Sequence, residues 1–340
     1  MKTRIYDLTV ADSYCHAIQD AAQTIANGGL VVFPTETVYG LGANAFDEKA
    51  VSRIFGAKGR PSDNPLIVHV ADVSMIAMLA DISEPQAKTV IDTFMPGPIT
   101  IILKKSDLVP YAVTAGLETV AIRMPNEKYA LDLIRKCQLP IAAPSANISG
   151  KPSPTRPEHV LQDMDGKADV ILLGENCLYG IESTVLDCTV HPARILRPGA
   201  ITQEQLAGVI ELALSENFSD SEKPKSPGMK YKHYKPNAAV IAVKGNDADV
   251  IDYINRSAGE SDDSAVLAFG ELENAFTASR FFSLGRRDQP QESAQVLFAY
   301  FRECDRLGVK SIYVMCTENK GIGRAYLNRL LKAADQVIEL

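Results

Sequence analysis

The chain has 340 residues, of which 46% are hydrophobic, and a formal net charge of −7. This length predicts two domains with sizeable cores, and the acidic balance argues against broad nucleic-acid binding through long-range attraction. No uncharged apolar run reaches the ~18 residues that a membrane span needs. The N-terminal stretch MKTRIYDLTVADSY carries charges and lacks the apolar segment of a secretory signal. We therefore expect a cytoplasmic protein.

The first part of the chain mixes predicted helices and strands. ADSYCHAIQDAAQTIANGG has an amphipathic helical pattern that ends at Gly28 and Gly29. Apolar, β-branched runs typical of strands follow, namely LVVFP, PLIVHV, ITIILKK, TVAIRMP, LPIAAPS, DVILLG, STVLDCT and ARILRPG. Helical patterns separate only some of these runs, which favours a mixed sheet with helices, α/β or α+β, over a strict βαβ repeat.

The composition changes at about residue 215. SENFSDSEKPKSPGMKYKHYKPN contains three prolines, many charges and little apolar content, as in an interdomain linker. Strand and helix patterns then alternate from AAVIAVKG to QVIEL, which predicts a small parallel α/β domain. We therefore expect three parts, at residues 1–214, 215–237 and 238–340.

The cysteines give no sign of a metal site. They form no CxxC pair and no cluster with histidine, and they stand at Cys15, Cys137, Cys177, Cys188, Cys304 and Cys316. This spacing argues against both a zinc site and a disulfide framework, and it fits a reducing compartment. We expect most of these cysteines to be small buried apolar residues, and no metal ligand from protein side chains.

Two nucleotide-binding signatures are absent or incomplete. The sequence contains no GxxxxGK[ST] phosphate loop. GIGRA at 321–325 follows a predicted strand and opens a predicted helix, but Tyr326 stands where GxGxxG needs its third glycine. Helix–sheet packing explains these glycines better than cofactor binding does.

The segment KGRPSDNPLIVHV suggests an anion site. An arginine can form two hydrogen bonds to a phosphate, and a lysine contributes a point charge, so Lys58 and Arg60 suit phosphate oxygens. Ser62 and Asn64 add neutral hydrogen-bonding groups just before a strand. A solvated charged loop is the alternative. The preceding segment PTETVYGLGANA at 34–45 combines small hydroxyls with glycines, which fits either a tight turn or a pocket for a small polar ligand.

Arg123, in the apolar strand TVAIRMP, needs a partner because a buried charge is costly when it is unpaired. The partner is either a carboxylate of the protein or a carboxylate or phosphate of a ligand. Glu182 is one protein carboxylate that could pair with an arginine. In the linker, KYKHYKP interleaves lysines with Tyr231 and Tyr234, a pattern that suits base stacking or a merely solvated linker.

Seven segments occur in an order that closely resembles the Sua5/YrdC family, namely PTETVYGLG, KGRPSDNPLIVH, MPGPIT, TVAIRMP, PIAAPSANISGKPSPT, ESTV and ILRPGAI. The linker SPGMKYKHYKP and the C-terminal domain resemble the longer Sua5 form. The resemblance implies a YrdC-like twisted mixed sheet with helices and a concave cavity, followed by a small Rossmann-like parallel α/β domain.

The same resemblance implies an L-threonylcarbamoyladenylate synthase, a nucleotidyltransferase. Such enzymes condense L-threonine, bicarbonate and ATP, with Mg²⁺ accompanying ATP, and release pyrophosphate. Their product serves N6-threonylcarbamoyladenosine formation at position 37 of tRNA and passes to the tRNA threonylcarbamoyl-transferase machinery. The resemblance implies at most weak tRNA or RNA binding and no membrane association.

The resemblance also implies site residues. Those near threonine would be Thr35, His69, Arg123 and Ser183. Those near ATP would be Lys58, Arg60, Ser62, Asn64, Thr119, Ser145, Asn147, Ser153, Arg197 and Tyr234. The chemistry needs orientation of two anionic reactants more than a dedicated nucleophile, so no dedicated nucleophile is expected and the sequence names no catalytic residue. The linker, including Tyr234, is a candidate lid.

Three other interpretations remain open from the residues alone. The first is an RNA-binding module that performs no catalysis, against which the acidic charge argues. The second is a dinucleotide-dependent oxidoreductase built on the C-terminal domain, against which the incomplete GIGRA motif argues. The third is a C-terminal domain with a purely structural or regulatory role.

Overall fold

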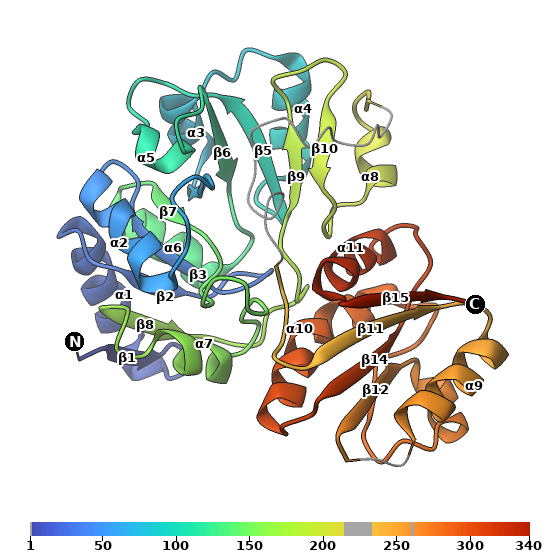
Figure 1. Cartoon of the computed structure of the whole chain (residues 1–340). Helices are drawn as coiled ribbons and strands as arrows, with labels where there is room; N and C mark the ends of the chain where they lie inside the picture. The colour runs from blue at the N-terminus through green and yellow to red at the C-terminus, as the bar shows by residue number, and fades with distance from the viewer. Residues whose placement is uncertain (1, 214–232, 260–261) are drawn as a thin grey trace. The chain divides into compact units, whose positions relative to one another are not determined.

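The computed structural model describes residues 2–213, 233–259 and 262–340, and its contacts divide them into two compact units (Figure 1). The described part of the N-terminal unit comprises residues 2–149, 154–178 and 182–213; the C-terminal unit comprises 150–153, 179–181 and the described residues from 233 onward. Most of the predicted linker, 215–237, lies outside the described residues. No helix among the described residues is long and apolar enough to cross a membrane.

The N-terminal unit contains a ten-stranded mixed sheet, which confirms the predicted fold class. Its strands, in spatial order, are β1 (Arg4–Asp7), β8 (Val170–Leu173), β2 (Val31–Phe33), β3 (Gly40–Asn44), β7 (Ile141–Ala143), β4 (Ile67–His69), β6 (Thr119–Arg123), β5 (Ile99–Lys104), β9 (Thr184–Asp187) and β10 (Arg194–Arg197). Parallel and antiparallel neighbours alternate irregularly: β4 is parallel to β6 but antiparallel to β7.

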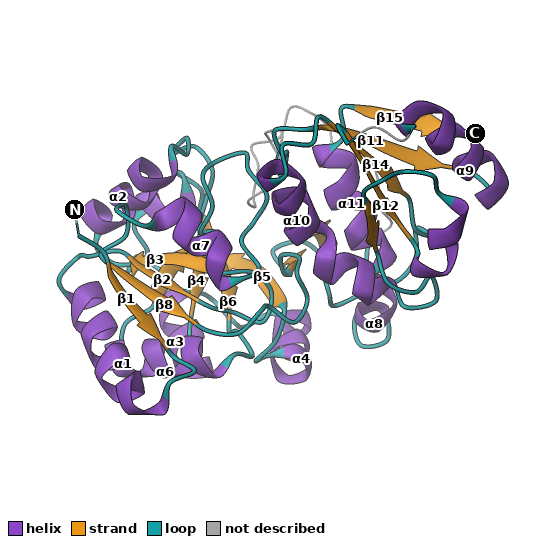
Figure 2. Cartoon of the chain, turned by 90° about the horizontal axis from the view of Figure 1, so that it is seen from below, coloured by secondary structure: helices purple, strands orange, loops and turns teal. Residues whose placement is uncertain are grey.

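The helices of this unit cover both faces of the sheet. They are α1 (Ala11–Ala26), α2 (Glu48–Lys58), α3 (Val73–Leu79), α4 (Pro85–Phe94), α5 (Tyr111–Thr114), α6 (Lys128–Cys137), α7 (Pro157–Met164) and α8 (Gln203–Ala207). Figure 2 shows α1 and α6 on one face and α2 and α7 on the other.

Two separate cores follow from this layering. Successive strand residues point to opposite faces, so Val31 and Phe33 pack with the residues of α1 and α6, whereas Val32 packs with those of α2. Burial on both faces explains why the strand LVVFP is apolar throughout.

The C-terminal unit is a parallel α/β fold, as the alternation predicts. Its sheet has the order β13 (Phe281–Ser283), β12 (Ser264–Ala268), β14 (Ser311–Met315), β11 (Ala239–Lys244) and β15 (Gln336–Glu339), and every neighbouring pair is parallel. The helical elements are α9 (Asp247–Ala258), the 3-10 turn η1 (Gly270–Ala275), α10 (Pro290–Arg306) and α11 (Gly323–Ala333). The short strand β13 and the turn η1 are not apparent from the sequence pattern.

The connections in this unit run in two directions. From β11 the chain crosses to β12 and then β13 on one side, and it returns through α10 and α11 to β14 and β15 on the other. Right-handed crossovers in opposite directions place their helices on opposite faces. Figure 2 shows this result, with α10 and α11 on one side of the sheet and α9 on the other.

Candidate functional site

A strip of apolar residues on one face of the N-terminal sheet organises the site. The strip consists of Ile67, Ile102, Ala121, Val185 and Leu196, which form a small cluster of their own. We call it the apolar strip. It crosses β4, β6, β5, β9 and β10, and its members come from strands that run in both directions.

Four polar residues lie two positions from members of the apolar strip. His69 and Arg123 follow Ile67 and Ala121, whereas Thr100 and Ser183 precede Ile102 and Val185. A spacing of two keeps side chains on one face, and β5 and β9 run antiparallel to β4 and β6. All four residues therefore lie along the same edge of the apolar strip. Thr119, two residues before Ala121, lies along the opposite edge.

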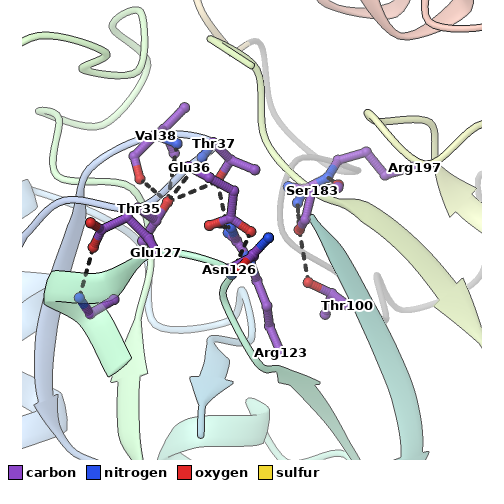
Figure 3. A network of polar contacts seen from close by, with 11 residues as sticks. Thr35, Glu36, Thr37, Val38, Thr100, Arg123, Asn126, Glu127, Ser183 and Arg197 are labelled. Carbon is purple, nitrogen blue, oxygen red and sulfur yellow. Dashed lines mark hydrogen bonds and ion pairs between the residues drawn. The ribbon is translucent and has the colours of Figure 1, made fainter. Parts of the chain in front are cut away.

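Arg123 forms a buried ion pair with Glu36 at this edge of the apolar strip. The Arg123 Nη2 and Glu36 Oε2 atoms are 2.7 Å apart, and the two side chains are 4% and 5% exposed. Arg123 Nη1 also donates a hydrogen bond of 2.7 Å to Thr37 Oγ1. Figure 3 shows Arg123 directed toward this Glu36–Thr37 turn. Of the two partners left open by the sequence, a protein carboxylate is therefore present.

The guanidinium of Arg123 still has capacity for a ligand. Nε is buried without a hydrogen-bond acceptor in the described part of the chain, whereas Nη2 lies 2.7 Å from the Glu36 carboxylate. Buried donors without acceptors are costly and uncommon. A carboxylate entering the site would satisfy them, so the geometry fits the predicted contact with an anionic substrate.

Thr35 begins the turn that presents Glu36 and Thr37. Its hydroxyl donates to the Val38 carbonyl (2.6 Å) and accepts from the backbone N–H groups of Thr37 (3.2 Å) and Val38 (3.3 Å). Such local side-chain bonds stabilise a turn after a strand. The turn holds Glu36, whose Oε1 accepts the backbone N–H of Asn126 at 3.0 Å. Thr35 is buried, and its hydroxyl stabilises the turn that positions Glu36 and Thr37.

Ser183 and Arg197 form a second polar group beside the first (Figure 3). Arg197 donates from Nε to the Ser183 carbonyl and from Nη2 to Ser183 Oγ, both at 3.1 Å, and Ser183 Oγ lies 2.8 Å from Thr100 Oγ1. The close approach needs glycine at 199, because a Cβ there would lie 2.2 Å from the Thr184 nitrogen. Arg197 and Ser183 are both buried.

Lys58 anchors the loop after β7. Helix α2 starts with Asp47 as its side-chain cap and ends at Gly59, whose φ of 61° suits glycine. This leaves Lys58, 2% exposed, as the last helical residue. Its Nζ donates to the carbonyl oxygens of Ser145 and Asn147. Lys58, Ser145 and Asn147 are thus brought together, as the predicted ATP contacts require.

The remaining residues of the KGRPSDN segment lie along the following loop. Asn64 is buried, and its Oδ1 has no hydrogen-bond partner among the described residues. Arg60 is half-buried and donates to the carbonyls of Asn64 (3.4 Å) and Pro65 (3.3 Å), while Ser62 is exposed. The turn at 35–39 connects the loop after β7 to Arg123. The Tyr39 carbonyl accepts the Ala146 N–H at 2.8 Å, and Thr37 Oγ1 accepts from Arg123.

His69 is buried at the end of β4, paired in register with Arg123 and edge-on to Phe33. Burial, with the positive charge of Arg123 as a second cause, lowers the pKa of His69 to about 3. The imidazole is therefore neutral at pH 7. Its Nδ1 is buried without a hydrogen-bond partner in the described part of the chain.

Two predicted ATP contacts, Ser153 and Tyr234, group with the C-terminal unit. Ser153 is buried. Tyr234 lies in the core of that unit, where its ring stacks on Phe298 with centroids 5.0 Å apart and the Arg329 guanidinium lies 5.7 Å from the ring centroid. The roles of both residues toward ATP stay predictions.

Sequence reasoning missed Glu36, Thr37, Thr100 and Glu127. The only sequence signal for Glu36 was a carboxylate in TET just after a strand, and this signal does not say which cation the carboxylate meets. Glu127 caps α6 by accepting the Ala130 N–H at 2.7 Å, and burial raises the pKa of Glu127 to about 7. The cysteines are all free; Cys177, Cys188 and Cys304 are buried as expected, whereas Cys137 and Cys316 are only partly buried and Cys15 is exposed. No cluster of three metal-binding side chains exists among the described residues.

Comparisons with known proteins identify relatives over nearly the whole chain. Residues 23–199 match the Sua5/YciO/YrdC family model, described as telomere recombination, and residues 201–335 match the model described as the C-terminal domain of threonylcarbamoyl-AMP synthase. The threonylcarbamoyl-AMP synthase of Pyrococcus abyssi is 45% identical, covering 93% of this chain and 94% of the relative. That of Bacillus subtilis is also 45% identical, covering 98% of both.

Solved structures give the same relationship. The crystal structure of P. abyssi Sua5 complexed with L-threonine has a TM-score of 0.89 and 42% identity, and the match covers 100% of both chains. Escherichia coli YciO, with a TM-score of 0.50 and 25% identity, matches 54% of this chain and 89% of its own.

Proposed function

This chain belongs to the Sua5/YciO/YrdC family, and from that premise we propose that it is a threonylcarbamoyl-AMP synthase. It condenses L-threonine, bicarbonate and ATP to threonylcarbamoyl-AMP and pyrophosphate, as a nucleotidyltransferase. The observation that carries the proposal is the buried guanidinium of Arg123, whose Nε has no hydrogen-bond acceptor in the described part of the chain.

The threonine carboxylate binds at Arg123. A planar guanidinium suits two-point recognition of a carboxylate, and Glu36 and Thr37 fix its position. Ser183, held by Thr100 and Arg197, offers a hydroxyl on the same face. Discrimination against serine rests on one methyl group, worth about 1–3 kcal/mol, whereas an unpaired buried polar group rejects apolar analogues more strongly.

ATP binds toward Lys58, Asn64, Ser145 and Asn147. Lys58 supplies a buried positive charge. Mg²⁺ accompanies ATP and is held mainly by phosphate oxygens and water, as is usual for that ion. It neutralises charge on the phosphates.

The reaction then proceeds in two steps. The threonine amine attacks the carbon of CO2 and loses a proton, or it attacks the carbon of bicarbonate and the displaced hydroxide leaves with that proton as water. Either route gives a carbamate. A carbamate oxygen attacks the α-phosphorus of ATP, and pyrophosphate leaves. The protein contributes orientation and neutralisation of two anionic reactants. His69 adds no positive charge to the site, because its pKa of about 3 keeps it uncharged at pH 7; its contribution is to orientation alone.

The product, an unstable mixed anhydride, is proposed to pass to the tRNA threonylcarbamoyl-transferase machinery for modification of adenosine 37. We place the chemistry in the cytoplasm, because all six cysteines are free thiols and reducing compartments preserve such thiols.

Pyrophosphate release from ATP tests this function. We expect release only when threonine and bicarbonate are both present, with threonylcarbamoyl-AMP detected by mass spectrometry. Release that continues without threonine, or in bicarbonate-free buffer, would show a different ATP-consuming reaction.

A further inference from the structure

Tyr39 lies where the threonine side and the ATP side of the proposed site meet. It directly follows the turn at 35–38, which accepts a hydrogen bond from Arg123 Nη1. The Tyr39 carbonyl accepts the Ala146 N–H at 2.8 Å, and Lys58 Nζ donates to the carbonyls of the residues on either side of Ala146. One residue therefore joins the group that we propose to hold threonine to the group that we propose to hold ATP.

The side chain of Tyr39 fastens this junction to the end of β8. Tyr39 is fully buried, and its hydroxyl makes two hydrogen bonds of 3.0 Å, donating to the Glu175 carbonyl and accepting the Gly174 N–H. The Tyr39 backbone N–H donates to the Pro154 carbonyl, also at 3.0 Å. Burial raises the pKa of the Tyr39 phenol well above its usual value, so the hydroxyl keeps its proton and remains a donor.

The segment that follows β8 supports the turn at both of its ends. Tyr39 follows the turn and is held by the phenol bonds, whereas Pro34 precedes it and packs on Gly174, where a Cβ would lie 2.9 Å from Pro34 Cγ. Between these ends, Thr35 Oγ1 closes the turn by donating to the Val38 carbonyl at 2.6 Å. A shift of the turn would break the phenol bonds and leave buried polar groups without partners, which is costly.

A reaction that joins two substrates depends on the distance between their binding groups. The carbamate oxygen must reach the α-phosphorus, and a misplacement of about 1 Å can cost about 100-fold in rate. We propose, on the basis of the proposed function, that Tyr39 is a positioning residue that fixes the threonine side of the site relative to the ATP side. Because it is fully buried, Tyr39 acts through the turn and the loop at 145–147.

Removal of the hydroxyl alone should therefore lower turnover more than substrate binding. In Tyr39→Phe the ring still fills its place, and the side chains of Arg123 and Lys58 are unchanged. We expect kcat for threonylcarbamoyl-AMP formation to fall at least about tenfold, while KM for threonine and KM for ATP each change by less than about threefold. A residue that only stabilised the fold would leave the kcat of the folded protein unchanged.

Tyr326→Phe is the matched control. Tyr326 is also fully buried, and its hydroxyl donates to a backbone carbonyl, that of Met315, at 3.0 Å. It belongs to the C-terminal unit, so its variant should keep the kcat of the unmodified chain. Hydrogen–deuterium exchange without substrate adds a readout that does not depend on activity. Peptides covering 35–40 and 143–149 should exchange faster in Tyr39→Phe than in the unmodified chain or in Tyr326→Phe.

Gly174→Ala is a second variant, which keeps both phenol bonds. Its new methyl group would press on the rigid ring of Pro34, so the turn must shift. We expect the same fall in kcat with little change in either KM, and urea unfolding shows that each variant is folded under the assay conditions. Gly174→Ala thus tests the proposal even if Tyr39→Phe does not fold.

Three results would overturn the proposal. The first is a kcat within about twofold of the unmodified chain in whichever of the two variants is folded. The second is an equal fall in kcat in Tyr326→Phe. The third is a rise in KM for one substrate with kcat unchanged. The proposed function fails in a different way, since the unmodified chain would then form no threonylcarbamoyl-AMP.

Discussion

Arg123 and Glu36 form an ion pair of 2.7 Å in which both side chains are almost fully buried. The pair comes from two distant parts of the chain, the strand β6 and the turn after β2. It fixes the guanidinium that we propose to hold the threonine carboxylate. Burying two charges costs several kcal/mol each, which only close pairing and further hydrogen bonds offset.

Replacing Glu36 by Gln should destabilise the protein strongly, because it leaves the Arg123 charge buried without its partner. We expect the free energy of unfolding in urea to fall by about 3–5 kcal/mol. Asp252→Asn is the control, since Asp252 pairs with Arg256 on an exposed helix face and such pairs contribute about 0–1 kcal/mol. Equal, small losses in both variants would mean that the buried pair has no special role.

Arg123→Lys should affect threonine more than ATP. The lysine keeps the charge but loses the planar fork that meets a carboxylate with two hydrogen bonds. We expect KM for threonine to rise about tenfold or more, the equivalent of ~1.4 kcal/mol, while KM for ATP changes little. Steady-state pyrophosphate release with each substrate varied in turn measures both constants. A parallel rise in the two would place Arg123 away from threonine.

Ser183→Ala should lower synthesis by disturbing two neighbours at once. It removes the partner of Thr100 Oγ1 and of Arg197 Nη2, and a lost partner for a buried polar group costs about 1–3 kcal/mol. We expect kcat/KM for threonine to fall about tenfold. Thr100→Ser keeps the hydroxyl and is the matched variant, expected to retain most activity. The interpretation would be wrong if Thr100→Ser were the more damaging change.

Lys58→Met should loosen the loop at 145–147 as well as weaken ATP binding. Its Nζ donates to two carbonyls of that loop, so faster amide exchange in the peptide covering 143–149 is expected together with a fall of at least 100-fold in kcat/KM for ATP. Lys58→Arg should not restore activity, because the site encloses Lys58 almost completely. Unchanged exchange in that peptide would show that Lys58 does not anchor the loop.

The buried His69 should make stability depend on pH. The pKa of His69 is about 3 in the folded chain and about 6.5 when unfolded, so below pH 6.5 the unfolded state binds more protons and stability falls as pH falls. Between pH 7 and pH 5 this contributes a loss of about 2 kcal/mol. The free energy of unfolding of His69→Gln, measured in urea at both pH values, should fall by about 2 kcal/mol less than that of the unmodified chain. An identical loss in both proteins would contradict a buried neutral imidazole.

Much of the local structure was predictable from the sequence. The apolar runs from PLIVHV to ARILRPG are strands as predicted, and the alternation after residue 238 produces a parallel sheet. Local signals suffice there, because hydrophobic period and turn residues act over a few positions. The strand β13 has only three residues, too few to produce a pattern.

The partners across the sheet were not predictable. A buried Arg123 required a partner, but the choice of Glu36 depends on the order of the strands, because β3, β7 and β4 lie between β2 and β6 in the sheet. The environment of Tyr234 has the same origin. The sequence left base stacking or a solvated linker open for its aromatic ring, and in the structure the ring is instead buried against Phe298.

A crystal structure of the chain with L-threonine and a non-hydrolysable ATP analogue tests the central claim most directly. We predict the threonine carboxylate within hydrogen-bonding distance of the Arg123 guanidinium, and the triphosphate on the side of Lys58 and Asn64. Both ligands bound away from Arg123 and Lys58 would contradict the account.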